Sequence, residues 1–144
     1  MHLDYKLSDH WKTDAAALAN EDETTFRYGA APGDIVLHGP EADFSTEWGW
    51  IPLLDFVLAL HDIVGKLGKG ERQTNFEFTE SDATLQFLRK GEVVHLTASY
   101  APGEIQTSLS EFRDAVHRFA GKLKKELAAK HPELAKHKLI QKLG

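Results

Sequence analysis

The residues of this chain best suited to acid–base or metal chemistry are its histidines, because imidazole titrates near neutral pH and binds transition metals. They lie at positions 2, 10, 38, 61, 95, 117, 131 and 137. None is spaced as H-x-H, H-x-x-x-H or H-E-x-x-H, the patterns that bring two ligands to one face of a strand or helix. The chain also has no cysteine, which removes thiolate ligands, disulfides and thiol nucleophiles. We therefore expect no metal site, no cofactor and no catalytic residue.

Other catalytic patterns are equally absent from the sequence. No serine stands in G-x-S-x-G or S-x-x-K, and the glycines at 65, 68 and 70 do not form a phosphate-binding loop. His61 would need an orienting carboxylate to act as a general base, and Asp55, six residues earlier, does not share its helix face. An enzymatic or ligand-binding site would have to assemble from dispersed residues such as His61, His95 and Tyr100.

Residues 41–50 (EADFSTEWGW) combine large aromatic side chains with carboxylates in an otherwise irregular stretch. Aromatic side chains anchor protein interfaces, and carboxylates steer a basic partner. The structural alternative is that Trp48 and Trp50 cover the core beside the helix that follows. The expected partner-binding residues are Glu41, Asp43, Phe44, Glu47, Trp48 and Trp50.

Charge is unevenly distributed along the chain. Residues 1–60 carry eleven acids and three bases, whereas residues 101–144 carry five acids and nine bases, and the whole chain has a net charge of −5. An acidic first half repels phosphate, so we expect a protein partner, in particular a basic one, and no nucleic acid. The lysines late in the last long helix lack a recognised nucleic-acid motif and are interpreted as a solvated face.

The elements that must position these residues follow from hydrophobic periodicity. Apolar residues at i, i+4 and i+7 predict two main helices at 51–67 and 109–130, the second opened by a capping box from Ser108 to Glu111. Alternating patterns predict strands. These are residues 3–7, 24–28 and 35–37, and a three-stranded meander over 73–100 with turns at Glu80–Asp82 and at Lys90–Gly91, broken at Ala101–Gly103 and extended at most by Ile105 and Thr107. Short helices are expected at 13–20 and 134–143.

These elements predict a single α+β domain over residues 1–144. Its fold would be an antiparallel sheet of about five to six strands with two main helices packed on one face. Residues 131–144 would add a loosely attached C-terminal helix. The N-terminus lacks the features of a signal peptide, and the longest apolar stretch, Ile51–Leu60, is too short to cross a bilayer. We therefore expect a cytoplasmic protein without a membrane anchor.

Three features together resemble small bacterial α+β domains, some of which look like immunity proteins of polymorphic toxin systems. They are the string from Trp50 to Leu60, the phenylalanine-rich meander, and the closing helix begun by Ser108-Leu-Ser-Glu-Phe112. The resemblance covers residues 24–130. It implies an inhibitor that binds a cognate toxin domain and blocks its active site. Such families vary widely in sequence, so no functional residue carries over to this chain.

The leading hypothesis is thus a non-enzymatic protein-binding inhibitor, in particular an immunity protein that neutralises a cognate bacterial toxin. A small ligand-binding domain or enzyme with a dispersed site is the second hypothesis, and a deep polar pocket would favour it. A structural or oligomerisation module is the third, and a large self-complementary apolar surface would favour it. The sequence leaves the oligomeric state open.

Overall fold

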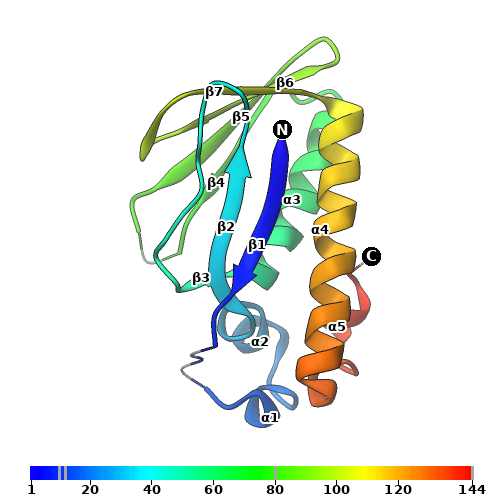
Figure 1. Ribbon diagram of the computed structural model, residues 1–144. Coiled ribbons are helices and arrows are strands. Elements are labelled where there is room, and N and C mark those ends of the chain that lie inside the picture. Colours follow the sequence, from blue (N-terminus) through cyan, green and yellow to red (C-terminus); the bar gives the residue numbers. More distant parts are fainter. Residues whose placement is uncertain (10, 12, 80, 144) are drawn as a thin grey trace.

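The computed structural model describes residues 1–9, 11, 13–79 and 81–143, so His10 and the first residue of the predicted turn at 80–82 lie outside it. The described residues form an α+β fold (Figure 1). The strands are β1 (His2–Leu7), β2 (Pro32–His38), β3 (Ile51–Pro52), β4 (Gln73–Glu77), β5 (Thr84–Lys90), β6 (Val93–Ala98) and β7 (Ala101–Ser108). The helices are α1 (Ala15–Leu18), α2 (Glu23–Gly29), α3 (Leu53–Gly68), α4 (Leu109–Lys130) and α5 (Lys138–Gln141), with a 3-10 turn at Pro132–Leu134.

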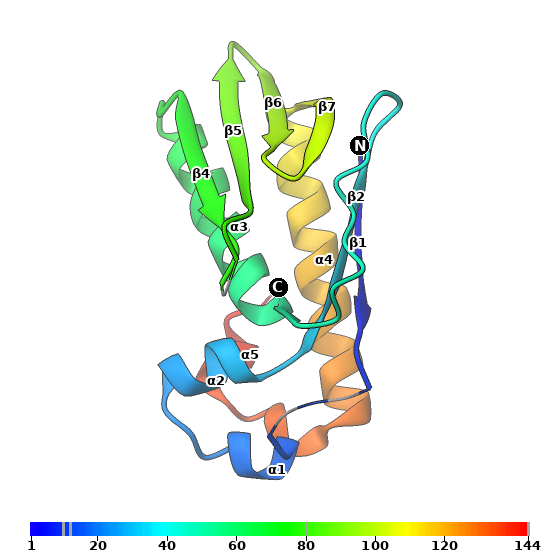
Figure 2. The ribbon, with the colours of Figure 1, turned by 90° about the vertical axis from the view of Figure 1, so that its left-hand side faces the viewer.

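The strands belong to two antiparallel sheets, ordered β1-β2-β3 and β4-β5-β6-β7. The prediction of one sheet of five to six strands is therefore wrong. The reason is that α3 begins directly after the two-residue strand β3, so the chain leaves the first sheet there. Each later strand then pairs with its neighbour in sequence. The two sheets stand side by side, with α3 and α4 packed together behind them (Figure 2).

The core lies where α3 and α4 meet the two sheets. Phe56 of α3 is fully buried and contacts Phe76 (5.1 Å between ring centroids), Phe78 (6.4 Å) and Phe119 of α4 (5.8 Å). Helix α4 also packs on β1, where the ring of Tyr5 lies 5.0 Å from that of Phe119. The apolar periodicity of the two long helices thus predicted their position correctly.

The strand predicted at 24–28 is wrong, because this segment is helix α2. Asp22 caps the helix by accepting a hydrogen bond from the amide of Thr25 at 2.8 Å. Phe26 is buried whereas Tyr28 is 47% exposed, so the two aromatic residues do not share a buried face as they would in a strand. The alternation was too short to distinguish one helical turn from a strand.

The expected break at 101–103 is also wrong, because β7 begins at Ala101 and forms a full fourth strand. Gly103 adopts a φ of 93°, which a glycine tolerates without strain. Pro102 lacks an amide hydrogen, but β7 is an edge strand and one side of its backbone needs no partner. The meander therefore has four strands instead of three.

The C-terminal segment packs against α2. Leu134, Leu139, Ile140 and Leu143 are buried. The ring of His137 stacks on Phe26 with 3.7 Å between centroids, and its Nδ1 accepts the amide of Leu139 at 3.2 Å. No helix of the described part of the chain is both long and apolar enough to span a membrane.

Ser108 caps α4 as predicted, since its hydroxyl accepts a hydrogen bond from the amide of Glu111 at 3.0 Å. Replacing Ser108 with alanine leaves that amide unpaired, so the free energy of unfolding should fall by about 1 kcal/mol. Urea denaturation measures this change. The exposed Ser110 in the first turn of α4 provides the control, and an equal loss in Ser110→Ala would contradict the capping role.

Candidate functional site

The segment predicted to bind a partner, residues 41–50, runs beside β2 as an irregular strand. An isolated antiparallel β-bridge pairs Asp43 of this segment with His38 of β2. Backbone and hydroxyl groups of the segment form further hydrogen bonds with β2. The hydrogen bonds run from Phe44 N to Leu37 O (2.7 Å), Thr46 N to Ile35 O (3.0 Å), Leu37 N to Ser45 Oγ (3.0 Å) and Ile35 N to Thr46 Oγ1 (3.2 Å). This irregular stretch of sequence therefore has a defined backbone.

Asp34 of β2 holds the second half of this segment in place. Its Oδ1 accepts hydrogen bonds from Thr46 Oγ1 (2.7 Å), the amide of Trp48 (2.7 Å) and the amide of Gly49 (2.9 Å). Gly49 adopts a positive φ of 78°, a conformation that glycine accommodates without strain, and its amide shares this carboxylate oxygen with the amide of Trp48. One side chain thus fixes the loop that carries both tryptophans.

The predicted binding residues fall into three groups by exposure. Glu41, Asp43 and Glu47 are exposed, and Trp48 and Trp50 are partly buried. Phe44 is 0% exposed, so its ring belongs to the core and offers no surface to a partner. Hydrogen bonds from Ser45 lower the pKa of Asp43, which keeps this exposed carboxylate ionised.

The two tryptophans stack on each other with ring centroids 5.4 Å apart and planes 14° from parallel. Trp48 also meets Phe78 and Tyr100 edge to face, each at 5.3 Å. The hydroxyl of Tyr100 donates to the carbonyl of Phe44 at 2.5 Å, and burial raises the pKa of this tyrosine. The stack therefore covers the core between the two sheets while keeping part of its surface in solvent.

Glu104 of β7, which was not among the predicted binding residues, lies close to the start of the 41–50 segment. The turn before residue 43 touches β7, since a Cβ added to Gly103 would lie 2.9 Å from Cβ of Ala42. Pro40, Glu41, Glu104 and Gln106 line a hollow of about 250 Å³ at this contact. Glu104 Oε1 lies 2.8 Å from Nδ1 of His95. The sequence signal that could have identified Glu104 is the alternation of side chains along β7. Glu104 faces outward because its neighbour Ile105 is buried.

The structure does not bring together His61, His95 and Tyr100, the residues suggested for a dispersed site. His61 lies on α3 next to His117 of α4, with ring centroids 5.4 Å apart. His95 faces outward from β6, where it pairs with Glu104. Tyr100 instead packs against Trp48. These settings support no common catalytic constellation of the three side chains.

Burial lowers the pKa of His61 below its ordinary value of 6.5, and the nearby His117 lowers it further. The unfolded chain therefore binds a proton at His61 more readily than the folded chain does. The free energy of unfolding should fall as pH drops through about 6.5, and His61→Gln should show a smaller fall. Denaturation from pH 7.5 to 5.5 in EDTA measures this. An unchanged pH dependence in His61→Gln would contradict the prediction.

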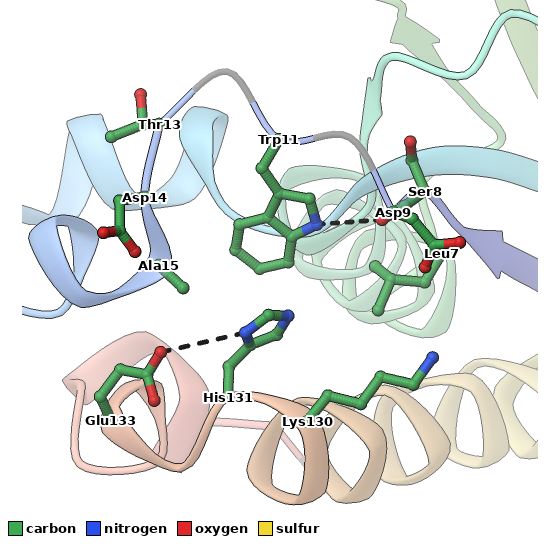
Figure 3. A pocket seen from close by; sticks show the side chains of 10 residues that line it. All are labelled: Leu7, Ser8, Asp9, Trp11, Thr13, Asp14, Ala15, Lys130, His131 and Glu133. Atoms are coloured by element: carbon green, nitrogen blue, oxygen red, sulfur yellow. Dashed lines mark hydrogen bonds and ion pairs between the residues drawn. The ribbon is translucent and has the colours of Figure 1, made fainter.

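A second candidate region is a cavity of about 410 Å³ between residues 7–9, 11 and 13–15 and the end of α4 (Figure 3). The rings of Trp11 and His131 face each other across it with centroids 4.5 Å apart. Several of its polar groups already have structural partners: Trp11 Nε1 donates to the carbonyl of Ser8 (3.0 Å), Asp14 caps α1, and Lys130 pairs with Glu126 (2.9 Å). The cavity is lined by both acidic and basic side chains, and the groups that remain would suit a small polar ligand.

Among residues 1–9, 11, 13–79 and 81–143, no three His, Asp or Glu side chains lie together where they could hold a metal ion. No protein-family model, curated protein or solved structure matches the chain.

Proposed function

We propose that this chain is a non-enzymatic binding protein that inhibits a basic protein partner, as an immunity protein neutralises a cognate bacterial toxin in the cytoplasm. One observation carries the proposal. Glu41, Asp43 and Glu47 are exposed on a segment that hydrogen bonds to β2 and, in its second half, to Asp34 hold in place, beside the partly exposed stack of Trp48 and Trp50. We call these five residues the acidic–aromatic surface.

The fixed backbone of this surface favours binding. Ordering a mobile loop on association costs free energy for each side chain that must be immobilised. The hydrogen bonds to Asp34 and the edge-to-face contact of Trp48 with Phe78 order the loop before a partner arrives. A stacked tryptophan pair then presents a rigid apolar area of the kind that dominates interface energies.

The charge of the surface defines the partner. Three exposed carboxylates lie within seven residues, and Glu104 of β7 lines the same hollow as Glu41. Carboxylates at the rim of an interface mainly raise the association rate with a basic protein. A toxin domain that binds nucleic acid would present a basic surface complementary to this one.

Reversing the charge of the surface should weaken partner binding. The variant Glu41→Lys/Asp43→Lys/Glu47→Lys should lose about ten- to a hundred-fold in affinity, mostly through a slower association rate. The partner is first isolated by pull-down at moderate salt with mass spectrometry, and the affinities are then measured by surface plasmon resonance.

The matched control carries the same change of charge elsewhere. Glu71→Lys/Glu77→Lys/Asp114→Lys alters three exposed acids after α3, on β4 and on α4. Its affinity should change by less than about three-fold if the effect is local, because distant charges are screened. Equal losses in both triple variants would reject the surface. The absence of any stoichiometric protein partner would reject the function, and a stable homodimer would favour an oligomerisation module instead.

The cavity of Figure 3 is the observation that favours the alternative, a small-ligand site. Its volume of about 410 Å³ falls within the usual range for ligand pockets. Two of its charged side chains, however, are engaged in capping and ion pairing. This leaves fewer groups to recognise a ligand than the acidic–aromatic surface offers to a protein.

A further inference from the structure

Within the part of the chain that the structure describes, one buried side-chain nitrogen or oxygen lacks a hydrogen-bond partner. This atom is Nε2 of His61, in the middle of α3. Buried polar atoms are almost always paired, since an unpaired one costs free energy. The Nε2 atom of His61 therefore has no partner among the described protein atoms, and a bound ligand could supply one.

A second imidazole lies beside the His61 ring, on the neighbouring helix α4. His117 of α4 places its ring centroid 5.4 Å from that of His61, with the planes 71° apart. Two imidazoles that bind one ion at about 2.0–2.1 Å and a tetrahedral angle have centroids roughly 5–5.5 Å apart. The observed spacing of 5.4 Å falls within this range.

The surroundings leave room for the remaining ligands of such an ion. Gly65 and Gly121 lie one helical turn beyond His61 and His117 and so share their helix faces. A Cβ added to either glycine would meet no atom within 4 Å. His117 is exposed, which opens a path for an ion and its water molecules.

We propose that His61 and His117 together bind one divalent transition-metal ion that prefers imidazole ligands, such as Zn²⁺ or Cu²⁺, with water completing its coordination. The neutral imidazole is the form that binds metal. With only two protein ligands, the ion is exchangeable. When bound, it links α3 to α4 independently of the acidic–aromatic surface.

The test uses the untagged full chain, freed of metal with EDTA and then titrated with ZnCl₂. Calorimetry should show one equivalent bound. The imidazole ¹⁵N signals of His61 and His117 should shift together in NMR spectra. His117→Ala, a change at an exposed position, should weaken zinc binding at least ten-fold and remove the shift of His61.

The control is His38→Ala. His38 forms a second histidine pair with His2, whose ring centroid is 4.9 Å away, but both rings are exposed on the first sheet. Its loss should change zinc affinity less than two-fold. His117→Gln repeats the test with a polar side chain, and circular dichroism checks the fold of each variant. The proposal is overturned if the chain binds no zinc, if His117→Ala and His117→Gln bind it as tightly as the original chain, or if only His38→Ala loses it.

Discussion

Replacing Asp34 with alanine should lower the free energy of unfolding by about 3 kcal/mol and also weaken partner binding. The carboxylate accepts three hydrogen bonds, and two of the donors are the backbone amides of Trp48 and Gly49. Hydrogen bonds to a charged acceptor each contribute roughly 1.5–3 kcal/mol, and bonds to one shared atom are not additive. Urea denaturation measures the stability, and amide hydrogen exchange at 48 and 49 reports whether the loop is released.

Asp34→Asn separates the charge from the geometry, because an amide retains one oxygen that can accept these bonds. We expect this variant to lose about half as much stability as Asp34→Ala. If Asp34→Ala costs less than about 1 kcal/mol, or leaves amide exchange at 48 and 49 unchanged, Asp34 does not fix the loop.

Removing Arg27 should be similarly damaging. Arg27 Nε of α2 lies 2.5 Å from Oδ1 of Asp55 in the first turn of α3, and the aspartate side chain is 8% exposed. Arg27→Ala would leave a buried carboxylate without its ion-pair partner, which typically costs about 3–5 kcal/mol. We expect a loss near the lower end of this range, about 3 kcal/mol. Arg27 is partly exposed, and the positive N-terminal end of α3 still stabilises the charge of Asp55. Chemical denaturation measures the loss.

The double variant Arg27→Ala/Asp55→Asn tests the cause. Removing the charge along with its partner should restore stability above that of Arg27→Ala alone, because the penalty comes from the unpaired carboxylate. A double variant no more stable than Arg27→Ala would show that Arg27 acts through packing instead.

Local patterns predicted the long elements of the fold well. The apolar spacing of the two main helices and the N-cap at Ser108 depend on residues within a few turns of one another, and the structure confirms them. The α2 segment was mistaken for a strand because its few residues fit both periods. The division into two sheets could not be predicted, since it depends on where β3 ends and which strands pair across the chain.

The candidate site shows the same division between local and distant information. Residues 41–50 attracted attention because aromatic and acidic types lie close together in sequence. The burial of Phe44 depends on the packing of the segment between the sheets, which periodicity does not report. Asp34 lies just before the strand predicted at 35–37, and its role as the anchor of the tryptophan loop depends on residues more than ten positions away.

The hydroxyls that hold residues 41–50 against β2 also limit how a partner can approach. The hydroxyls of Ser45 and Thr46 accept hydrogen bonds from the amides of Leu37 and Ile35. These two amides of β2 are therefore not available to pair with an incoming peptide. The irregular backbone of the covering segment offers no even ladder for another strand. Extension of the first sheet by a foreign chain is therefore blocked on this side, which guards against edge-to-edge aggregation. Recognition here must depend on side chains, so affinity will follow the surface chemistry of the partner and not its readiness to adopt an extended strand.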